Sequence, residues 1–268
     1  MGRVSGGTKR AARTAIVTGA SAGIGAATAV ELGRRGWRVA LGARRVERLA
    51  EVAREVEAAG GDAFARVLDV ADPASIDAFY EAAQAALGPI DALVNNAGMS
   101  ILNRLERAEA ESLRAELDVN LLGPMLLCRR AIPAMLARRK GDLVFVSSEN
   151  AVRPRPYQAG YSAAKAGLEA LARVLAMELD GTGLRSVVVR LGPTGSEFGA
   201  RMDHAVLKEA LEAWKYWGLQ RHLHWMPSES AAKAIVRLLE TPVEESYTNL
   251  VEVQPGGRKK EYLREEGG

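Results

Sequence analysis

The regular alternation of short apolar runs with longer helix-like stretches constrains this chain more than any other feature. Seven runs rich in Val, Ile, Leu and Ala recur along the sequence, and the residues between them are rich in Ala, Glu, Leu and Arg. Such βα repetition predicts a parallel sheet with helices on both faces. The runs lack a clean polar–apolar alternation, as expected of strands buried on both sides. The expected strands are 14–18, 38–41, 63–68, 91–94, 142–146, 185–191 and 249–253.

Local signals mark several ends of the helices expected between these runs. Asp72 precedes Pro73, which suits a capped helix start, and Gly88 suits a helix end. Pro133, inside an expected helix, predicts a bend or an adjusted turn. Together these elements predict a single-domain α/β fold: a Rossmann-like, doubly wound parallel sheet of about seven strands with helices on both faces. The expected helices are 25–35, 46–59, 73–87, 108–139, 157–179 and 229–240.

The charge of the chain is concentrated at its N-terminus. There are 36 Lys+Arg against 33 Asp+Glu, but residues 1–13 hold four basic side chains and no acid. The rest of the 268 residues is therefore near neutral, and the pI of about 9.1 is a property of the tail. We expect a disordered basic tail at 1–13, one domain at 14–257, and a C-terminal tail at 258–268.

Composition excludes several classes of protein. A near-neutral body argues against a nucleic-acid partner, and no apolar stretch approaches the roughly 18 residues of a membrane helix. No apolar signal segment begins the chain, and Cys128 is the only cysteine, which excludes an intrachain disulfide framework. His222 and His224 lack a carboxylate or cysteine cluster, so we expect no metal site. A cytoplasmic protein with a small-molecule ligand and no membrane contact is the expectation.

A glycine-rich turn, TGASAGIG, follows the first expected strand and opens the first helix. Gly19 permits a tight turn with positive φ, Gly23 lacks a side chain where a phosphate would approach, and Gly25 lets the helix pack close to the strand. Free N–H groups and the positive end of the helix dipole would then face an anion. A tight turn with nothing bound is the alternative, but the place at the first βα junction favours a dinucleotide site.

Tyr161 and Lys165 lie four residues apart on an expected helix and therefore share one face. A tyrosine with a pKa near 10 is a poor acid–base catalyst at neutral pH. We expect the Lys165 ammonium to lower the pKa of Tyr161, which makes a proton donor for a carbonyl oxygen or a base for an alcohol. Ser148 ends the fifth expected strand, and its hydroxyl is suited to hold the substrate oxygen. An ordinary half-exposed helix face is the alternative.

Three motifs, in this order and spacing, resemble those of the short-chain dehydrogenases/reductases. TGASAGIG resembles the family's cofactor turn, residues 95–98 resemble its NNAG segment, and the YSAAK sequence at 161–165 resembles its YxxxK motif. The resemblance spans about residues 14–257. It implies a Rossmann fold, a nicotinamide cofactor that supplies the redox chemistry, and a Ser-Tyr-Lys-Asn catalytic set.

The resemblance assigns a role to each member of that set. Tyr161 is the acid/base, Lys165 lowers its pKa and holds the nicotinamide ribose, and Ser148 polarises the carbonyl. Ser148 rather than Ser147 is chosen because it lies thirteen residues before the tyrosine, as in the family. Asn120, in the sequence DVNL, matches the family's asparagine that helps to hold a water in a proton relay.

The residues that follow the second expected strand bear on the choice between NADP and NAD. Members of the family that prefer NAD place an acid where this chain has Ala43, and Arg44 follows as in members that use NADP. The guanidinium of Arg44, with Arg45 beside it, offers bidentate bonds to a 2′-phosphate. NADP(H) is therefore the expected cofactor and NAD(H) the alternative. Ala22 departs from the pattern, because many NADP users have a basic residue there.

The turn after the sixth expected strand also departs from the family. Leu191 replaces the usual proline and Pro193 follows Gly192, which puts the local backbone geometry in question. Thr194 or Ser196 would contact the carboxamide of the nicotinamide. The resemblance assigns to the cofactor Gly19, Ser21, Gly23, Ile24, Gly25, Arg44, Arg45, Asp69, Val70, Asn96, Ala97, Gly98, Tyr161, Lys165, Gly192, Pro193 and Thr194.

Residues 194–227 are too long for a plain loop and hold five of the 14 Phe, Trp and Tyr residues. In the family this region is the substrate-binding lid. The enrichment favours an apolar or aromatic substrate, and a small satellite core or a subunit contact is an equal alternative. Arg153 and Arg155, just before the expected catalytic helix, are expected in a solvated loop.

These inferences predict an oxidoreductase that transfers a hydride between NADP(H) and a ketone or secondary alcohol. An NAD-dependent alcohol dehydrogenase acting oxidatively is the alternative within the enzymes. A non-catalytic dinucleotide-binding sensor is the alternative in another class, and the complete catalytic set argues against it. Because members of the family usually associate through the fourth and fifth helices, we expect a homotetramer or homodimer.

Overall fold

The computed structural model describes residues 12–199, 203–220, 224–242 and 247–256. Its strands are β1 (Thr14–Thr18), β2 (Arg38–Ala43), β3 (Asp62–Val67), β4 (Ala92–Asn95), β5 (Gly141–Ser148), β6 (Leu184–Leu191) and β7 (Leu250–Val253). These seven strands form one sheet in the order β3-β2-β1-β4-β5-β6-β7, and all neighbours are parallel. The chain winds outward from β1 to β3, then returns past β1 to β4. The expected doubly wound fold is confirmed.

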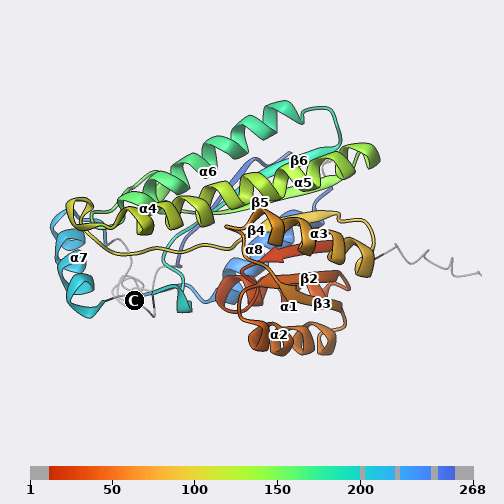
Figure 1. The fold of residues 1–268 in the computed structure, drawn as a ribbon, viewed down its shortest axis with the longest axis horizontal. Coiled ribbons are helices and arrows are strands. Elements are labelled where there is room, and N and C mark those ends of the chain that lie inside the picture. The colour runs from red at the N-terminus through yellow and green to blue at the C-terminus, as the bar shows by residue number, and fades with distance from the viewer. Residues whose placement is uncertain (1–11, 200–202, 221–223, 243–246, 257–268) are drawn as a thin grey trace, which may run out of the picture.

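Helices cover both faces of this sheet (Figure 1). Their bounds are α1 (Gly23–Arg34), α2 (Val46–Ala58), α3 (Pro73–Leu87), α4 (Ala110–Leu117), α5 (Gly123–Arg138), α6 (Ala159–Glu178), α7 (His204–Tyr216) and α8 (Ser228–Glu240). One core lies between the sheet and α1, α2 and α8, and the other lies between the sheet and α3, α5 and α6. Val17 belongs to the first core and Ile16 to the second. Both faces of each central strand are therefore apolar, which explains the unbroken apolar runs.

The helix expected over 108–139 is interrupted in the structure. A π-helical turn, Asp118–Leu122, separates α4 from α5. Gly123, the first residue of α5, packs against the chain after β3: an ideal Cβ on it would lie 2.5 Å from the Val70 carbonyl oxygen. The helix continues through Pro133 to Arg138.

The amino edge of the sheet is held by ion pairs, and Arg13 takes part in them. Its Nη2 lies 2.6 Å from Asp142 Oδ2, and its guanidinium stacks 4.2 Å from the centroid of the Trp37 ring. Asp142 also pairs through Oδ1 with Arg185 Nε at 2.8 Å. The prediction that residues 1–13 are a disordered tail is therefore wrong at Arg13, because this side chain is fixed by tertiary contacts. The rest of that tail up to residue 11, and the tail at 258–268, lie outside the described residues.

The carboxyl ends of the strands meet at the opposite edge. The direction of winding reverses between β1 and β4, and ligands of open parallel sheets bind at such a reversal. In Figure 1, α7 extends beyond this edge, next to α4. Within the described part of the chain, no helix combines the length and apolar character needed to cross a membrane.

Candidate functional site

The glycine-rich turn joins β1 to α1 at the reversal of the sheet. Gly19 and Gly23 have φ angles of +66° and +55°, a region that residues with a side chain rarely adopt. A Cβ on Gly25 would overlap the carbonyl oxygen of Gly19. Each of the three glycines therefore meets a local requirement of the backbone.

Thr18, at the end of β1, ties this turn to the segment that follows β4. Its buried hydroxyl accepts hydrogen bonds from Asn96 N at 3.0 Å and from Ala97 N at 2.9 Å. Asn96 Nδ2 donates to the Thr18 carbonyl oxygen at 2.8 Å. Two expected cofactor residues, Asn96 and Ala97, thus lie beside Gly19. Sequence reasoning overlooked Thr18, although a hydroxyl residue directly before the turn was an available signal.

The start of α1 has the chemistry that an anionic cofactor requires. Ala22 begins the helix without a side-chain hydrogen bond, and the described first turn holds no acidic residue. The N–H groups and the positive end of the helix dipole are therefore available to an anion. Ile24 packs against the core on the other side of the turn. A Cβ on Gly23 would lie 2.9 Å from Ser196 Cβ, so two chain segments approach closely here. These residues fit the pyrophosphate of a dinucleotide.

Arg45, rather than Arg44, reaches the glycine turn. Its Nε and Nη2 donate to Ser21 Oγ at 3.2 and 3.1 Å, and its Nη1 pairs with Glu197 Oε2 at 2.7 Å. Arg44 is exposed. Of the two arginines considered for a 2′-phosphate, the structure brings Arg45 together with Ser21.

Asp69 and Val70 lie directly after β3, at the same carboxyl edge. Asp69 Oδ1 accepts a hydrogen bond from Ala71 N at 3.0 Å, and Asp69 N donates to Ser75 Oγ at 2.9 Å. Val70 is buried. These bonds fix the turn on which the expected adenine contact depends.

The turn after β6 keeps its place although Leu191 stands at the proline position. Gly192 N donates to Val253 O at 2.9 Å, so the turn is paired with β7. A Cβ on Gly192 would overlap the side-chain oxygen of Gln254. The carbonyl oxygen of Pro193 accepts from Met226 N at 2.8 Å.

Thr194 and Ser196 differ in what they face. Thr194 Oγ1 donates to the Gly192 carbonyl oxygen at 2.9 Å. Ser196 lies over Gly23, as its short distance to an ideal Cβ there shows. The structure therefore brings Ser196, which was considered only as an alternative, to the glycine turn.

Ser148 ends β5 and Tyr161 lies in the first turn of α6, where the Ser148 hydroxyl is close enough to lower the pKa of the phenol. Burial nevertheless raises the pKa of Tyr161 to about 12, although the Ser148 hydroxyl and the charge of Arg155 lower it; Glu116 raises it further. The prediction that Lys165 brings this pKa down is wrong in this structure. Desolvation of the phenolate outweighs the effects of the Ser148 hydroxyl and the Arg155 guanidinium.

Lys165 lies close to Tyr161 but bonds elsewhere. Its Nζ is 5.7 Å from the centroid of the Tyr161 ring and donates to the Val146 carbonyl oxygen at 2.9 Å. Burial lowers the pKa of Lys165 to about 8, and the Glu169 carboxylate opposes this shift. A Cβ on Gly98 would lie 3.7 Å from this ammonium, so the NNAG segment packs against it.

Asn120 lies in the π-helical turn between α4 and α5 and is fully buried. Its Oδ1 accepts from Met99 N at 3.2 Å, and its Nδ2 donates to Met99 O at 2.7 Å and to Glu116 O at 2.8 Å. A Cβ on Gly98 would lie 2.9 Å from Asn120 Oδ1. Such π-turns occur frequently at functional sites, where they redirect one side chain. The four expected catalytic side chains thus share one edge of the sheet.

A buried carboxylate that sequence reasoning missed supports the lysine. Glu169 lies one turn after Lys165 on α6, accepts from Ser147 Oγ at 2.8 Å, and receives both Nε and Nη2 of Arg190 at 2.9 and 2.6 Å. Arg190 Nη1 also pairs with Glu252 Oε2, on β7, at 3.2 Å. Alternating charges therefore connect the catalytic helix to β6 and β7.

Arg155 is not in a solvated loop. It pairs with the buried Glu149, and its guanidinium lies 5.2 Å from the centroid of the Trp214 ring on α7. Trp214 Nε1 donates to the Pro156 carbonyl oxygen at 2.8 Å. The expectation is wrong here because α7 covers this loop. Arg153 is half-buried, and it pairs with Glu252 at 3.6 Å.

The aromatic residues of the expected lid divide into two groups. Phe198 packs on Tyr161 with ring centroids 5.5 Å apart, and Trp214 packs on the loop before α6. Tyr216, Trp217 and Trp225 are exposed by 83, 67 and 64%. One of the five therefore lies against Tyr161, one packs on the loop before α6, and three face outward. Part of the expected lid, 200–202 and 221–223 with His222, lies outside the described residues.

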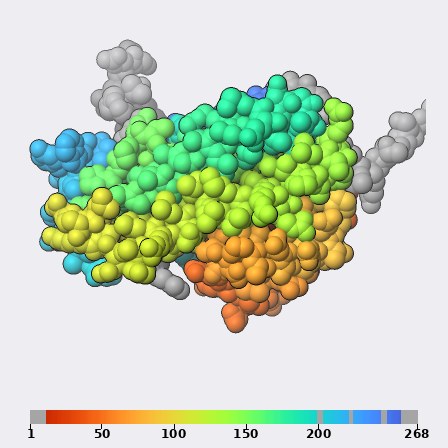
Figure 2. Space-filling model, turned by 45° about the horizontal axis from the view of Figure 1, so that its top comes forward, coloured from red at the N-terminus to blue at the C-terminus, as the bar shows by residue number. Residues whose placement is uncertain are grey.

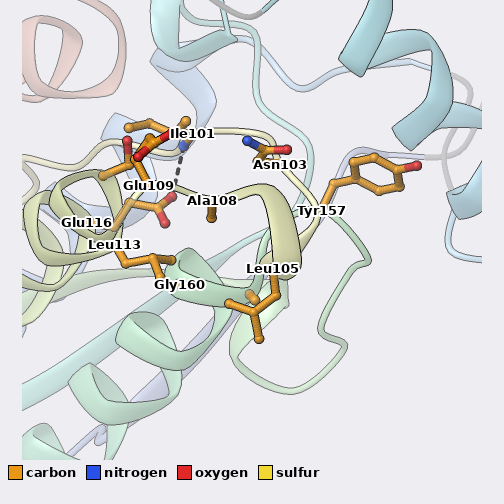
Figure 3. A pocket seen from close by; sticks show the side chains of 11 residues that line it. Ile101, Asn103, Leu105, Ala108, Glu109, Leu113, Glu116, Tyr157 and Gly160 are labelled. Carbon is orange, nitrogen blue, oxygen red and sulfur yellow. Dashed lines mark hydrogen bonds between the residues drawn. The ribbon is translucent and has the colours of Figure 1, made fainter.

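A small hollow lies next to the start of α6 (Figure 3). It is lined by the segment from Ile101 to Glu109, by α4, and by the residues around Gly160. Figure 3 shows the Glu116 side chain directed toward Ile101, with Gly160 below it. The hollow therefore adjoins the residue that precedes Tyr161.

Cys128 is buried, as predicted, and burial raises its pKa to about 12. Asn95 Nδ2 donates to its Sγ at 3.8 Å. Across the described ranges, no group of three or more His, Cys, Asp or Glu side chains is arranged to hold a metal ion.

Comparison with known proteins agrees with this geometry. A family model described as short chain dehydrogenase matches residues 13–206. The protein belongs to the short-chain dehydrogenase family, a family of oxidoreductases that act on CH–OH and C=O groups.

Three relatives illustrate the match. The chain is 34% identical over 230 residues to 3beta-hydroxysteroid dehydrogenase 1 of Eggerthella lenta, which covers 82% of this chain and 88% of that protein. It is 33% identical over 243 residues to glycine betaine reductase ATRR of Emericella nidulans; 91% of this chain is covered, but it spans only 19% of that longer protein. A metagenomic short-chain oxidoreductase, solved in complex with NADP, superposes with a TM-score of 0.75 at 34% identity, covering 92% of this chain and 98% of that one.

Proposed function

We propose that this protein is an NADP(H)-dependent oxidoreductase that interconverts a ketone and a secondary alcohol with apolar or aromatic substituents. The observation that carries the proposal is the convergence of Ser148, Tyr161, Lys165 and Asn120 at the sheet edge that also bears the glycine turn. The Eggerthella relative is named for a hydroxysteroid, an apolar secondary alcohol, and the metagenomic neighbour was solved with NADP.

The glycine turn would hold the pyrophosphate at the start of α1, and the turn from Gly192 to Ser196 would hold the nicotinamide end. When bound, the nicotinamide supplies or accepts the hydride. The fit rests on the uncapped start of α1 and on the positive φ angles of Gly19 and Gly23 in the turn before it.

Tyr161 moves the proton. Its pKa of about 12 keeps the phenol protonated at neutral pH, which suits donation to a carbonyl oxygen that gains negative charge. Ser148, whose hydroxyl lies close enough to the phenol to lower its pKa, would donate to the same oxygen. Lys165 adds a positive charge beside the phenol ring, and Asn120 holds the segment after Gly98 in place.

The packing of Phe198 on Tyr161 supports an apolar substrate, because an apolar wall then adjoins the proton donor. The outward-facing Tyr216, Trp217 and Trp225 add nothing to that wall.

The oxidation of NADPH with a panel of ketones of increasing apolar area tests the proposal. We expect turnover that rises with the apolar area of the ketone. Tyr161→Phe should reduce kcat by roughly a thousandfold, within the range of general acid catalysis, and its Kd for NADPH, measured by nicotinamide fluorescence, should match that of the wild type. Full activity of Tyr161→Phe would contradict the mechanism. NADPH binding without turnover of any ketone or alcohol would favour the non-catalytic sensor instead.

Arg45 supports the preference for NADP(H) over NAD(H). Its contact with Ser21 places a guanidinium at the turn where a 2′-phosphate would lie. Arg45→Ala should weaken NADPH binding about tenfold, the worth of one charge-assisted contact, and leave NADH binding unchanged. Arg44→Ala is the matched control, since Arg44 is exposed. A larger loss of NADPH affinity in Arg44→Ala than in Arg45→Ala would favour Arg44 as the residue that binds the 2′-phosphate.

Self-association through α4, α5 and α6 is the further part of the proposal. These helices present apolar side chains to the surface, and Figure 2 shows α5 in yellow-green beside α6 in green on one face. Light scattering of the purified protein should give the mass of a dimer or tetramer, and a monomer would contradict this part. The exposed apolar side chains are Leu117, Leu122, Met125, Leu136, Val174 and Met177.

A further inference from the structure

We propose that Glu116 is a positioning residue that sets the place of Tyr161 by clamping the start of α6 to the segment after β4. The inference deepens the proposed function and rests on it, because it concerns the same proton donor. Glu116 lies on α4, outside the motifs from which the catalytic set was predicted.

The carboxyl group of Glu116 holds the segment after β4. The residue is 2% exposed, and its Oε1 accepts a hydrogen bond from Ile101 N at 2.8 Å, which Figure 3 shows as a dashed line. Its backbone carbonyl oxygen accepts from Asn120 Nδ2 at 2.8 Å. One residue therefore fixes both a segment that lines the hollow and an expected member of the catalytic set.

The other carboxyl oxygen meets the start of α6. A Cβ on Gly160 would overlap Glu116 Oε2, so the carboxyl lies directly on the backbone of this residue. Tyr161 is the next residue of the helix. The absence of a side chain at Gly160 thus allows Glu116 to approach the proton donor through the backbone.

The electrostatic surroundings agree with this closeness. Burial raises the pKa of Glu116, while the Ile101 N–H lowers it, and the Glu116 charge in turn raises the pKa of Tyr161. Glu109 and Tyr157 line the same hollow. A carboxyl group is costly to bury without partners, so its place here is explained by the two segments that it joins.

Four variants test the clamp. Glu116→Gln keeps an acceptor for Ile101 N and should retain kcat within about threefold. Glu116→Ala removes the clamp and should reduce kcat roughly tenfold to a hundredfold, the effect of a small misplacement of a reacting group. Gly160→Ala should do the same, because the added methyl group displaces the carboxyl. The double variant Glu116→Ala/Gly160→Ala should be no slower than Glu116→Ala. The overlap with the carboxyl group is then gone, and the nearest remaining atom is Leu113 Cδ2 at 3.2 Å, the end of a flexible side chain. The Kd for NADPH should be unchanged in all four, because neither residue belongs to the glycine turn, which joins β1 to α1.

The outcomes separate this inference from the proposed function. An unchanged kcat in Glu116→Ala, or losses that multiply in the double variant, would overturn the clamp. The free energies of urea unfolding of the wild type, the two single variants and the double variant form a double-mutant cycle that tests the Glu116–Gly160 contact without any turnover. If the losses in the free energy of unfolding of the two single variants add up in the double variant, the clamp is also overturned. If the wild type turns over no ketone or alcohol, the proposed function fails, and the unfolding cycle still decides whether the contact exists.

Discussion

The buried carboxylates at the amino edge of the sheet and the buried Lys165 at the carboxyl edge have opposite surroundings. At the amino edge, Asp142 faces Arg13 and Arg185, and Asp91 faces Arg138 at 2.9 Å and Lys140 at 3.2 Å. Each carboxylate there is matched by cations within salt-bridge distance. At the carboxyl edge, the Lys165 ammonium is buried against a backbone carbonyl oxygen, and burial lowers its pKa to about 8.

The difference shows which of these buried charges stabilise the fold and which one serves the proposed chemistry. A matched buried pair stabilises the fold as long as both partners remain. A buried ammonium bonded to a neutral oxygen destabilises the fold, because the charged form has lost its water. The protein keeps Lys165 at such a position beside Tyr161, where the proposed reaction needs a positive charge.

Substitution of Lys165 should produce the largest effect. Lys165→Met should reduce kcat by roughly a thousandfold, and it should raise the free energy of unfolding at pH 7 by about 1–3 kcal/mol because the desolvated charge is gone. Between about pH 8 and 10.5 the unfolded wild type binds more protons than the folded wild type, so this gain should shrink as pH rises through that range.

Urea unfolding at several pH values measures the gain. Lys233→Met, at an exposed position on α8, is the control and should change neither quantity. A Lys165→Met protein less stable than the wild type at pH 7 would contradict the claim that the buried Lys165 charge destabilises the fold.

Asp142 should show the reverse pattern. Asp142→Ala should lower the free energy of unfolding by roughly 3 kcal/mol, because Arg185 then keeps a buried charge with backbone carbonyl partners alone. The kcat per folded molecule should stay the same. Glu106→Ala, which breaks the exposed pair with Arg104, should cost under about 1 kcal/mol in the same assay. Equal losses in the free energy of unfolding for Asp142→Ala and Glu106→Ala would show that burial does not decide how much an ion pair stabilises this fold.

Asp91 should give the smallest effect, visible as a pH dependence. Burial alone would raise the pKa of Asp91, but the Thr14 N–H, Arg138 and Lys140 together lower it below its ordinary 3.8. Its stabilisation is therefore complete above pH 3.8 and is lost as pH falls through the lower folded-state pKa. Asp91→Asn should lower the free energy of unfolding by about 1–2 kcal/mol at pH 7. The difference in this free energy between the variant and the wild type should become smaller in acid.

Thermal unfolding between neutral pH and acid checks this dependence. Asp77→Asn, at the exposed carboxylate beside Arg130, is the matched control. A difference that stays constant into acid would mean that Asp91 is not ionised through this pairing.

The sequence was sufficient for the parts of this protein that depend on local patterns. The strands coincide with apolar runs because both faces of the sheet are buried under helices, so neighbouring residues of one strand are both apolar. Val17 packs into one core and Ile16 into the other. The order and spacing of the motifs brought Ser148, Tyr161, Lys165 and Asn120 to one edge, because the carboxyl ends of parallel strands must meet there.

The parts that depend on tertiary contact were missed. Glu116 and Glu169 were not singled out, because no local sequence pattern indicates a partner such as Ile101 N or Arg190. The π-turn has no signal in composition, since it arises from packing. Arg45 was ranked after Arg44 because spacing along a strand does not show which side chain turns toward Ser21.

The register of the last three strands has a consequence for the C-terminal part of the chain. Ser148 pairs with Leu191, and Leu191 pairs with Val253. The serine, the last residue of β6 and the last residue of β7 therefore lie side by side across the sheet. Gln254 then lies against Gly192. A chain cut before residue 249 would retain every recognisable motif and lose the strand and the Gln254 side chain that support the turn after β6. Inheritance of the motifs alone is thus a poor guide to whether a shortened relative still works.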